Sequence, residues 1–529
     1  MLAVVPSATL LGLEGRFIRV EVDVAPGLPG FTIVGLADTA LQEARERIRG
    51  ALRNAGYVHP PRRITVNLAP ADLRKAGASL DLAMAMGILL GSEQVRPGTG
   101  RVGLIGELSL GGEVRAVPGT LPMVAALARR GIRRVGVAAA AVDEAALVGD
   151  VEIIGLTSLE DAVEAVRAPR SRRRIVPASR VTFDDDAHAR LMDGPVPAAS
   201  DPGVAVPDLA DVRGQAEARR GLEIALAGGH GLLLTGPPGV GKTLLARTVP
   251  GLLPALDDAA ALAVTIVASA AGEGPITGLI RRPPYRAPHH TISYAAMVGG
   301  GPRLSPGEVT LADHGVLFLD ELPEFGRDVL ESLRQPLEEG RVVIARAGRA
   351  TTFPARFQLL AAMNPCPCGF AGTEDGRCLC PTGVVERYER RVSGPLRDRI
   401  DLWITMPRVS PTAIVSGPMP EGSEVVAARV AVARLVVSQR MRRTLTAVPN
   451  GRLTGSGLRA ACGMDAATQR RATSLADEER ASGRGTERLL RVARTIADLA
   501  GDDVVRSSHL DEAAWYRQKR SAGLAAVAG

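Results

Sequence analysis

A glycine-rich loop between an apolar run and the start of a helical pattern constrains this chain more than any other part of its sequence. The apolar run ends at Thr235. The loop that follows consists of Gly236, Pro237, Pro238, Gly239, Val240, Gly241, Lys242 and Thr243. Glycines let consecutive backbone N–H groups face phosphates, the lysine neutralises the β- and γ-phosphates, and the threonine hydroxyl binds the accompanying Mg²⁺. The sequence therefore predicts a phosphate-binding loop for a nucleoside triphosphate, ATP or GTP, together with Mg²⁺.

Length and composition narrow the class of protein. A chain of 529 residues suggests roughly three domains. The net charge of +7 suits a polyanionic partner such as nucleic acid, although the excess is small for this length. The chain has no apolar run long enough to span a bilayer and no basic segment followed by a long apolar stretch at its start. We therefore expect a cytoplasmic protein without membrane attachment.

Composition shifts divide the chain into four segments. In residues 1–166 short β-rich runs alternate with helical patterns, which predicts an α/β domain. Residues 167–206 are rich in proline and poor in hydrophobic residues, so we expect a linker. Residues 207–408 carry the glycine-rich loop and predict a second α/β unit, a parallel sheet flanked by helices. Residues 409–529 show helical patterns with almost no strand signal.

Three polar side chains follow two further apolar runs. Asp320 and Glu321 end one run, and Asn364 ends the other. Each run alone is also compatible with a core strand or a turn. Beside a phosphate loop they indicate a nucleotide site, because ligands bind at the carboxyl ends of parallel strands. We expect Asp320 to hold Mg²⁺ with Thr243, Glu321 to polarise the attacking water, and Asn364 to contact the γ-phosphate or that water.

Two later segments, residues 393–401 and 482–491, supply arginines. Guanidinium groups stabilise the charge that develops on the γ-phosphate, and an arginine so far along the chain is often supplied by a neighbouring subunit. In an arginine-rich chain, a solvated helix face is the commoner explanation for any single arginine. The order of the motifs gives these residues further support.

The motif order closely resembles that of the magnesium-chelatase-like AAA+ ATPases of the YifB/ComM family over essentially the full chain. Besides the glycine-rich loop, the matching segments are residues 285–293, 306–308, 315–322, 364–369 and 394–401. The resemblance implies an AAA+ ring, expected to be a hexamer, with ATP bound between subunits. It also implies an arginine finger at Arg399 and a sensor-2 residue at Arg484, at the start of a lid helix. Arg397 stands where the family more usually has an apolar residue, so either Arg397 or Arg399 reaches the neighbour; we favour Arg399.

Four of the five cysteines form two closely spaced C-x-C pairs. The first pair is Cys366 and Cys368, and the second is Cys378 and Cys380. Four thiolates can close a tetrahedral structural Zn²⁺ site. Because C-x-C is tighter than the usual C-x₂-C, the pattern indicates metal binding in general more strongly than zinc. Reduced thiols and a disulfide are the alternatives, and Cys462, which stands apart, is expected to be inert.

Residues 101–119, with residues 75–81 before them, look like the domain shared by Lon proteases and the repair ATPase Sms/RadA. Lon-type proteolysis needs a serine nucleophile in a particular turn and a lysine that accepts its proton. Ser79 stands in a different local sequence, and residues 119–123 contain no lysine. We therefore expect a non-proteolytic domain that serves ring assembly or nucleic-acid contact.

Two basic segments, residues 281–290 and 341–349, predict loops that hold a nucleic-acid strand by its phosphates without reading sequence. The second reads as a hairpin with Arg346 and Arg349 near its tip. His289 and His290 lack an adjacent third ligand, which favours structural hydrogen bonding over a metal pair.

Two functions compete. The first, implied by the resemblance, is an ATP-driven ring motor on branched or single-stranded DNA, with branch-migration or helicase activity in recombination or natural transformation. The alternative is a magnesium-chelatase-like ATPase that remodels a protein or metallo-enzyme partner. The two share the same ATP chemistry, so the nucleotide site cannot separate them.

Overall fold

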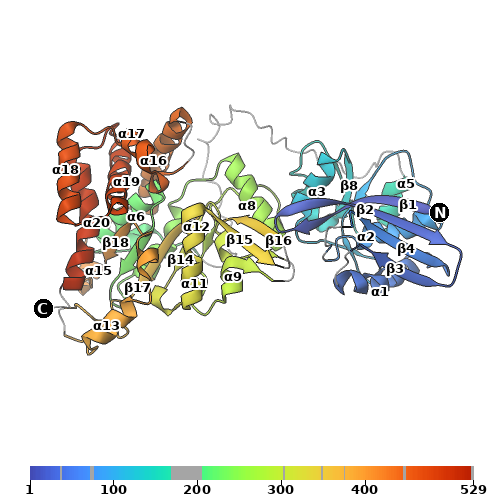
Figure 1. Ribbon diagram of the computed structural model, residues 1–529, viewed down its shortest axis with the longest axis horizontal. Helices are drawn as coiled ribbons and strands as arrows, with labels where there is room; N and C mark the ends of the chain where they lie inside the picture. Colours follow the sequence, from blue (N-terminus) through green and yellow to red (C-terminus); the bar gives the residue numbers. More distant parts are fainter. Residues whose placement is uncertain are drawn as a thin grey trace.

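The computed structural model shows three groups of elements arranged in a row (Figure 1). An α/β part lies at one end, a parallel-sheet unit in the middle, and a group of helices at the other end. The residues that the structure describes are 1–35, 39–71, 75, 77–167, 205–301, 304–346, 349–373, 376–444 and 448–525. The linker expected over residues 167–206 lies almost wholly outside them. No helix of the described residues is long and apolar enough to cross a membrane.

The N-terminal part contains two sheets. The first has the order β1–β2–β4–β3 and is built from β1 (Leu2–Leu11), β2 (Glu14–Ala25), β3 (Gly30–Val34) and β4 (Arg63–Ala69). Strands β1, β2 and β4 pair antiparallel, whereas β3 runs parallel to β4. The second sheet is parallel, in the order β5 (Gly103–Leu104), β8 (Arg134–Ala138) and β9 (Glu152–Leu156), beside a small pair β6 (Glu107–Leu108) and β7 (Val114–Arg115).

Five helices complete this part. They are α1 (Thr39–Asn54), α2 (Asp81–Gly91), α3 (Thr120–Arg129), α4 (Val142–Ala145) and α5 (Leu159–Arg167). Helix α2 is buried almost all round because it packs on β1 and β2 and is covered by α1. That environment explains its nearly uniform apolar sequence, since a helix without a polar face is a core helix.

The middle unit is built on a five-stranded, all-parallel sheet. Its order is β11 (Tyr285–Arg286), β14 (Val316–Leu319), β17 (Gln358–Met363), β10 (Leu232–Thr235) and β18 (Leu402–Thr405). Every neighbouring pair is parallel, so all five carboxyl ends meet at one edge. All four residues of β14 are buried, as expected for a strand covered on both faces.

Helices and two hairpins surround this sheet. The helices are α6 (Ala216–Gly228), α7 (Lys242–Arg247), α8 (Asp258–Ala271), α9 (Tyr294–Val298), α10 (Glu308–Leu311), α11 (Arg327–Ser332), α12 (Arg334–Glu339), α13 (Thr382–Glu389) and α14 (Gly394–Arg397). The hairpins are β12 (Gly299–Gly300) with β13 (Ser305–Pro306), and β15 (Arg341–Arg346) with β16 (Arg349–Pro354). Short 3₁₀ helices are η1 (Ala139–Ala141), η3 (Leu209–Asp211), η4 (Val249–Gly251), η5 (Leu322–Glu324) and η6 (Asn450–Arg452).

The C-terminal helices share a core with the sheet. They are α15 (Pro411–Val415), α16 (Ser423–Thr444), α17 (Gly455–Cys462), α18 (Ala466–Glu478), α19 (Gly483–Ala500) and α20 (Ser507–Ala525). Leu234 and Ile404 of the sheet belong to the same buried cluster as Val430, Ile496 and Tyr516 of these helices. The C-terminal helices are therefore packed on the parallel-sheet unit rather than tethered to it.

Among the described residues, the N-terminal part touches the middle unit at two places. The backbone N–H of Gly119 donates to the Ser269 carbonyl of α8 at 2.8 Å, and the Ser269 hydroxyl donates to the Glu144 carboxylate at 2.6 Å. At the β1–β2 turn, Gly12 packs on β16, where a Cβ at position 12 would lie 2.7 Å from Thr351 Cγ2. Leu13 of the same turn packs against the core beneath the β15–β16 hairpin.

Candidate functional site

The glycine-rich loop connects β10 to α7 at the carboxyl edge of the parallel sheet. Gly239 and Gly241 have φ of +81° and +95°, in the left-handed region that favours glycine. A Cβ at either position would meet nothing within 4 Å, so the loop faces open space there. Gly236 is enclosed instead, because a Cβ would lie 2.4 Å from the Met406 carbonyl oxygen at the end of β18. The loop is thus anchored at its start and open over its middle, a cradle that fits phosphate groups.

Lys242 joins the loop to the end of β17. Its ammonium group donates to the Gly236 carbonyl at 2.6 Å, the Pro237 carbonyl at 2.9 Å and the Asn364 side-chain oxygen at 3.0 Å. The lysine is 8% exposed, and desolvation lowers its pKa, although Asp320 and Glu321 oppose that shift. The structure therefore brings together Lys242 and Asn364, two residues that the sequence assigned to one site.

Thr243 and Asp320 meet on the other side of the loop. The Thr243 hydroxyl donates to one Asp320 carboxylate oxygen at 2.6 Å, and the Glu321 backbone N–H donates to the other at 3.0 Å. A hydroxyl and a carboxylate in contact beside a phosphate cradle are the oxygen ligands that Mg²⁺ prefers. The donor set fits the ion that accompanies a nucleoside triphosphate.

Glu321 has an unusual backbone and an unexpected neighbour. Its φ of +53° is uncommon for a residue with a side chain, and that side chain is 55% exposed. One carboxylate oxygen lies 3.5 Å from Nδ1 of His290, whose ring is 4.1 Å from that of His289. Sequence reasoning considered the two histidines only as a metal pair or as structural groups. Their position beside Glu321 follows from the parallel pairing of β11 with β14. Residues that follow adjacent parallel strands emerge at the same edge of the sheet.

The two candidate finger arginines differ in what holds them. Arg397 folds back on its own chain: Nε donates to the Val392 carbonyl at 2.9 Å, and the guanidinium carbon lies 5.9 Å from the centre of the Trp403 ring. Arg399 pairs with Glu338, a half-exposed side chain on α12, and is itself 12% exposed. Arg397 therefore has a packing role within its subunit.

No hydrogen bond or ion pair among the described residues links Arg399 or Arg484 to the loop residues, Asp320, Glu321 or Asn364. Arg484 is exposed in the first turn of α19. Within the chain these two arginines thus stand apart from the cradle.

A buried polar network ties the loop after Arg399 to the lid. His230 lies 2.9 Å from an Asp401 carboxylate oxygen through Nδ1 and 2.7 Å from the Thr495 hydroxyl of α19 through Nε2. The Asn450 amide donates to that hydroxyl at 3.1 Å and to Asp498 at 2.7 Å. All these groups are buried, so each depends on the others for its hydrogen bonds. The sequence analysis assigned no role to any of them.

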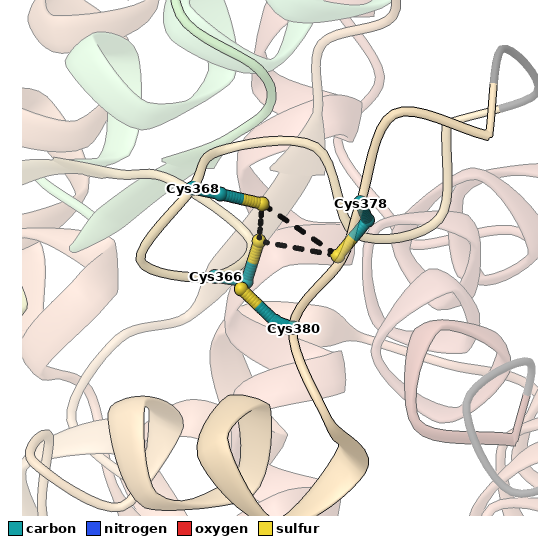
Figure 2. Close-up of side chains that lie close together, drawn as sticks. All are labelled: Cys366, Cys368, Cys378 and Cys380. Carbon is teal, nitrogen blue, oxygen red and sulfur yellow. Dashed lines mark hydrogen bonds between the residues drawn. The ribbon is translucent and has the colours of Figure 1, made fainter.

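The four clustered cysteines come together in one loop, as Figure 2 shows. The sulfur of Cys366 is 3.2 Å from that of Cys368 and 3.8 Å from that of Cys378, and Cys368 and Cys378 are 3.6 Å apart. With Cys380 included, all four sulfurs lie within 4.8 Å of one another. Zinc–sulfur bonds of about 2.3 Å in a tetrahedron separate sulfurs by about 3.8 Å, so the arrangement fits a Cys₄ zinc site. The hydrogen bond with Cys366 lowers the pKa of Cys368 to about 6.

Cys462 lies apart from this cluster in the helical part. It is buried, its sulfur is 3.8 Å from the Leu490 carbonyl oxygen, and desolvation raises its pKa to about 11. These properties are those of an unreactive thiol.

The basic segments expected to contact nucleic acid are only partly described. Arg286 is bound within the unit, to Glu308 at 2.7 Å and to Glu273 at 2.8 Å. The hairpin expected over residues 341–349 is present, and its register places Arg346 opposite Arg349. The side chains of those two arginines lie outside the described residues.

Comparisons with known proteins match this architecture along most of the chain. Three protein-family models match: "Magnesium chelatase, subunit ChlI" over residues 208–414, "Subunit ChlI of Mg-chelatase" over residues 20–141, and "Magnesium chelatase, subunit ChlI C-terminal" over residues 420–517. An uncharacterized protein of Mycobacterium tuberculosis is 42% identical over 504 residues, 94% of each chain. The uncharacterized protein YifB of Escherichia coli is 39% identical over 518 residues, 98% of this chain and 97% of that protein. The competence protein ComM of Haemophilus influenzae is 38% identical over 522 residues, with the same coverage.

Proposed function

The chain belongs to the YifB/ComM family of magnesium-chelatase-like AAA+ proteins, and on this premise we propose that it is an ATP-hydrolysing ring motor that acts on DNA. That it is an ATPase of this family follows from the comparisons; the motor and its substrate are the proposal. The convergence of Lys242, Thr243, Asp320 and Asn364 on one phosphate cradle carries the ATP-hydrolysis part of the proposal.

We propose a separate role for each residue of the site. Lys242 exchanges its carbonyl partners for the phosphates, and Asn364, already 3.0 Å from the ammonium group, faces the γ-phosphate or the attacking water. Glu321 accepts the proton of that water, since its exposed carboxylate follows directly after Asp320. Mg²⁺, held by Thr243 and Asp320, supplies charge neutralisation on the phosphate oxygens when bound. His290 beside Glu321 fixes the direction of the carboxylate.

The site is completed by a second copy of the chain. Arg399 lies away from the cradle of its own subunit, on a loop that the buried network holds to the lid. A guanidinium group from a neighbour would stabilise the charge on the transferred phosphoryl group. We therefore propose a closed ring, a hexamer as the family resemblance implies. In this ring Arg399 acts on the nucleotide of a neighbouring subunit, and Arg484 on the lid helix is the sensor-2 residue.

DNA is the proposed substrate of the motor. The relative named competence protein ComM, the net charge of +7 and the two basic segments support it. A polyanion held by its phosphates is bound in a salt-dependent and sequence-tolerant way.

The test is an ATPase assay with no DNA, single-stranded DNA, duplex and a four-way junction. We expect stimulation by branched or single-stranded DNA that declines steeply as salt is raised. Replacing Arg346 and Arg349 with Gln should remove the stimulation, whereas Arg470→Gln, an exposed arginine on α18, should not. No stimulation by any DNA at low salt would refute the DNA motor.

The match to magnesium chelatase subunits favours the second candidate, an ATPase that remodels a protein or metallo-enzyme. A protein that hydrolyses ATP at a rate indifferent to every DNA, yet responds to a protein partner, would establish that function instead.

We also propose that the four clustered cysteines hold one structural Zn²⁺ per chain. Elemental analysis of the purified protein should find about one zinc per chain. Four freely titratable thiols in native, zinc-free protein would contradict it.

A further inference from the structure

The cysteine loop is in contact with the phosphate loop. Gly369, next to Cys368, has φ of +86°, and a Cβ there would lie 2.7 Å from Cδ and 3.2 Å from Cγ of Pro238. Because Pro238 is part of the phosphate loop, the backbone of the cysteine loop forms one wall of the cradle. The absence of a side chain at position 369 is what permits this close approach.

The other end of the same turn also reaches the nucleotide site. Asn364, which binds Lys242, precedes Cys366 by two residues. The chain after Cys366 turns tightly: the Gly369 N–H donates to the Cys366 carbonyl at 2.9 Å, and the Ala371 N–H donates to the Cys366 sulfur at 3.2 Å. Cys366 and Cys368 thus lie in the short stretch between Asn364 and Gly369, the two residues through which the cysteine loop contacts the nucleotide site.

The sulfurs of this turn are held by the far side of the loop. Cys378 lies within 3.8 Å of both Cys366 and Cys368 (Figure 2). Phe370, directly after Gly369, adds a second brace, because the guanidinium carbons of Arg377 and Arg408 lie 5.9 Å and 5.4 Å from its ring centre. Arg408 follows β18, whose end also packs on Gly236. What binds the four sulfurs thus decides where the wall of the cradle stands.

We propose that the cysteine cluster and the phosphate loop form a coupled pair of binding sites, in which a metal ion on the four thiolates increases the affinity of the loop for nucleotide. The proposal rests on the proposed function for the two ligands and adds the linkage between them. By thermodynamic reciprocity, nucleotide must increase the affinity of the cluster for the metal by the same factor. Couplings of this kind typically amount to about 5–150-fold.

The test uses the full-length protein and measures binding, not turnover. A fluorescent, non-hydrolysable ATP analogue with Mg²⁺ is titrated into zinc-loaded protein and into protein stripped with a zinc-selective chelator. Zinc affinity is then measured by competition with a chromophoric chelator, with and without the analogue. We expect at least about fivefold weaker nucleotide binding after zinc removal, and an equal shift in zinc affinity when nucleotide is present.

Three glycine substitutions separate the effect of the contact with Pro238 from the effect of an unfavourable backbone conformation. Gly369→Ala places a Cβ against Pro238, whereas Gly372→Ala and Gly376→Ala, at φ of +72° and +62° in the same loop, meet nothing within 4 Å. All three substitutions place a side chain at a positive φ in the left-handed region. We expect Gly369→Ala alone to weaken nucleotide binding severalfold at unchanged zinc content. The linkage in the wild-type protein tests the proposal even where a variant fails to fold.

Two outcomes would overturn the coupling. Equal nucleotide affinity with and without zinc, in protein that binds both, would refute the linkage and leave the proposed function standing. If the purified protein binds no zinc or no nucleotide, the coupling is refuted because one of its two ligands is missing. That result would also count against the proposed function.

Discussion

Replacing Thr495 with Val keeps the side-chain volume but removes one hydroxyl from the buried network. This network joins the C-terminal lid helices to the loop that follows Arg399. The Thr495 side chain is 1% exposed, and its oxygen lies 2.7 Å from His230 Nε2, 3.1 Å from the Asn450 amide and 3.1 Å from the Arg491 carbonyl. In the variant, His230 Nε2 loses its partner in a buried site, and Asn450 keeps only its bonds to other groups, such as Asp498.

The magnitude follows from these contacts. A buried polar atom left without a partner costs about 1–3 kcal/mol, and the loss of one further hydrogen bond about 1 kcal/mol. We therefore expect the free energy of unfolding to fall by about 2–4 kcal/mol in total. Thr473→Val on α18 is the matched control, because the Thr473 hydroxyl makes the same bond to the carbonyl four residues earlier, at 3.1 Å, but is exposed.

Guanidinium denaturation followed by tryptophan fluorescence measures the difference. The chain has two tryptophans, Trp403 in β18 and Trp515 in α20, so the signal reports on the sheet and the lid and not on the N-terminal part. That selectivity matters because a chain with several domains does not unfold in one step. If Thr495→Val and Thr473→Val differ by less than about 0.5 kcal/mol, which is the usual scatter of surface substitutions, the network does not join lid to loop as described.

Three further substitutions test the proposed chemistry. Glu321→Gln should bind ATP normally but lower turnover by at least about 10²-fold, because the amide cannot accept the proton of the water; phosphate release within twofold of wild type would remove Glu321 from its role. Arg399→Ala should lower turnover by about 10³–10⁵-fold with nucleotide binding retained. Mixing this variant with wild-type chains should depress the activity of the mixture. Arg390→Ala, a change at an 80% exposed arginine of the same region, should have neither effect. Full activity of the pure Arg399 variant would argue against a shared site. Asn364→Ala should lower single-turnover rates by about 10²-fold with little change in nucleotide affinity, and an unchanged rate would show that the amide only supports Lys242.

The sequence could predict which residues meet at the carboxyl edge of the parallel sheet, because each of them belongs to a recognisable local pattern. A buried run followed by a polar residue marks the end of a parallel strand, and Asp320 and Asn364 both fit this pattern. The four cysteines are equally local, and the structure gathers them as their spacing suggested.

What the sequence did not show depends on tertiary packing. His230, Asp401 and Thr495 come from three distant elements, and no periodicity marks a histidine that will lie between an aspartate and a threonine. The same holds for His290 beside Glu321. Helix α19 begins at Gly483 and is capped by Ser482, whose hydroxyl accepts from the Gly485 N–H at 3.2 Å, so Arg484 lies in its first turn.

The N-terminal part contacts elements that adjoin both basic segments, residues 281–290 and 341–349. Its β1–β2 turn lies against β16, one leg of the arginine hairpin, and α3 with Glu144 holds the end of α8, from which the chain runs on toward residues 281–290. In the proposed motor, force on a strand held by either segment would pass through these contacts to the N-terminal part, whose described residues lie outside the proposed nucleotide site.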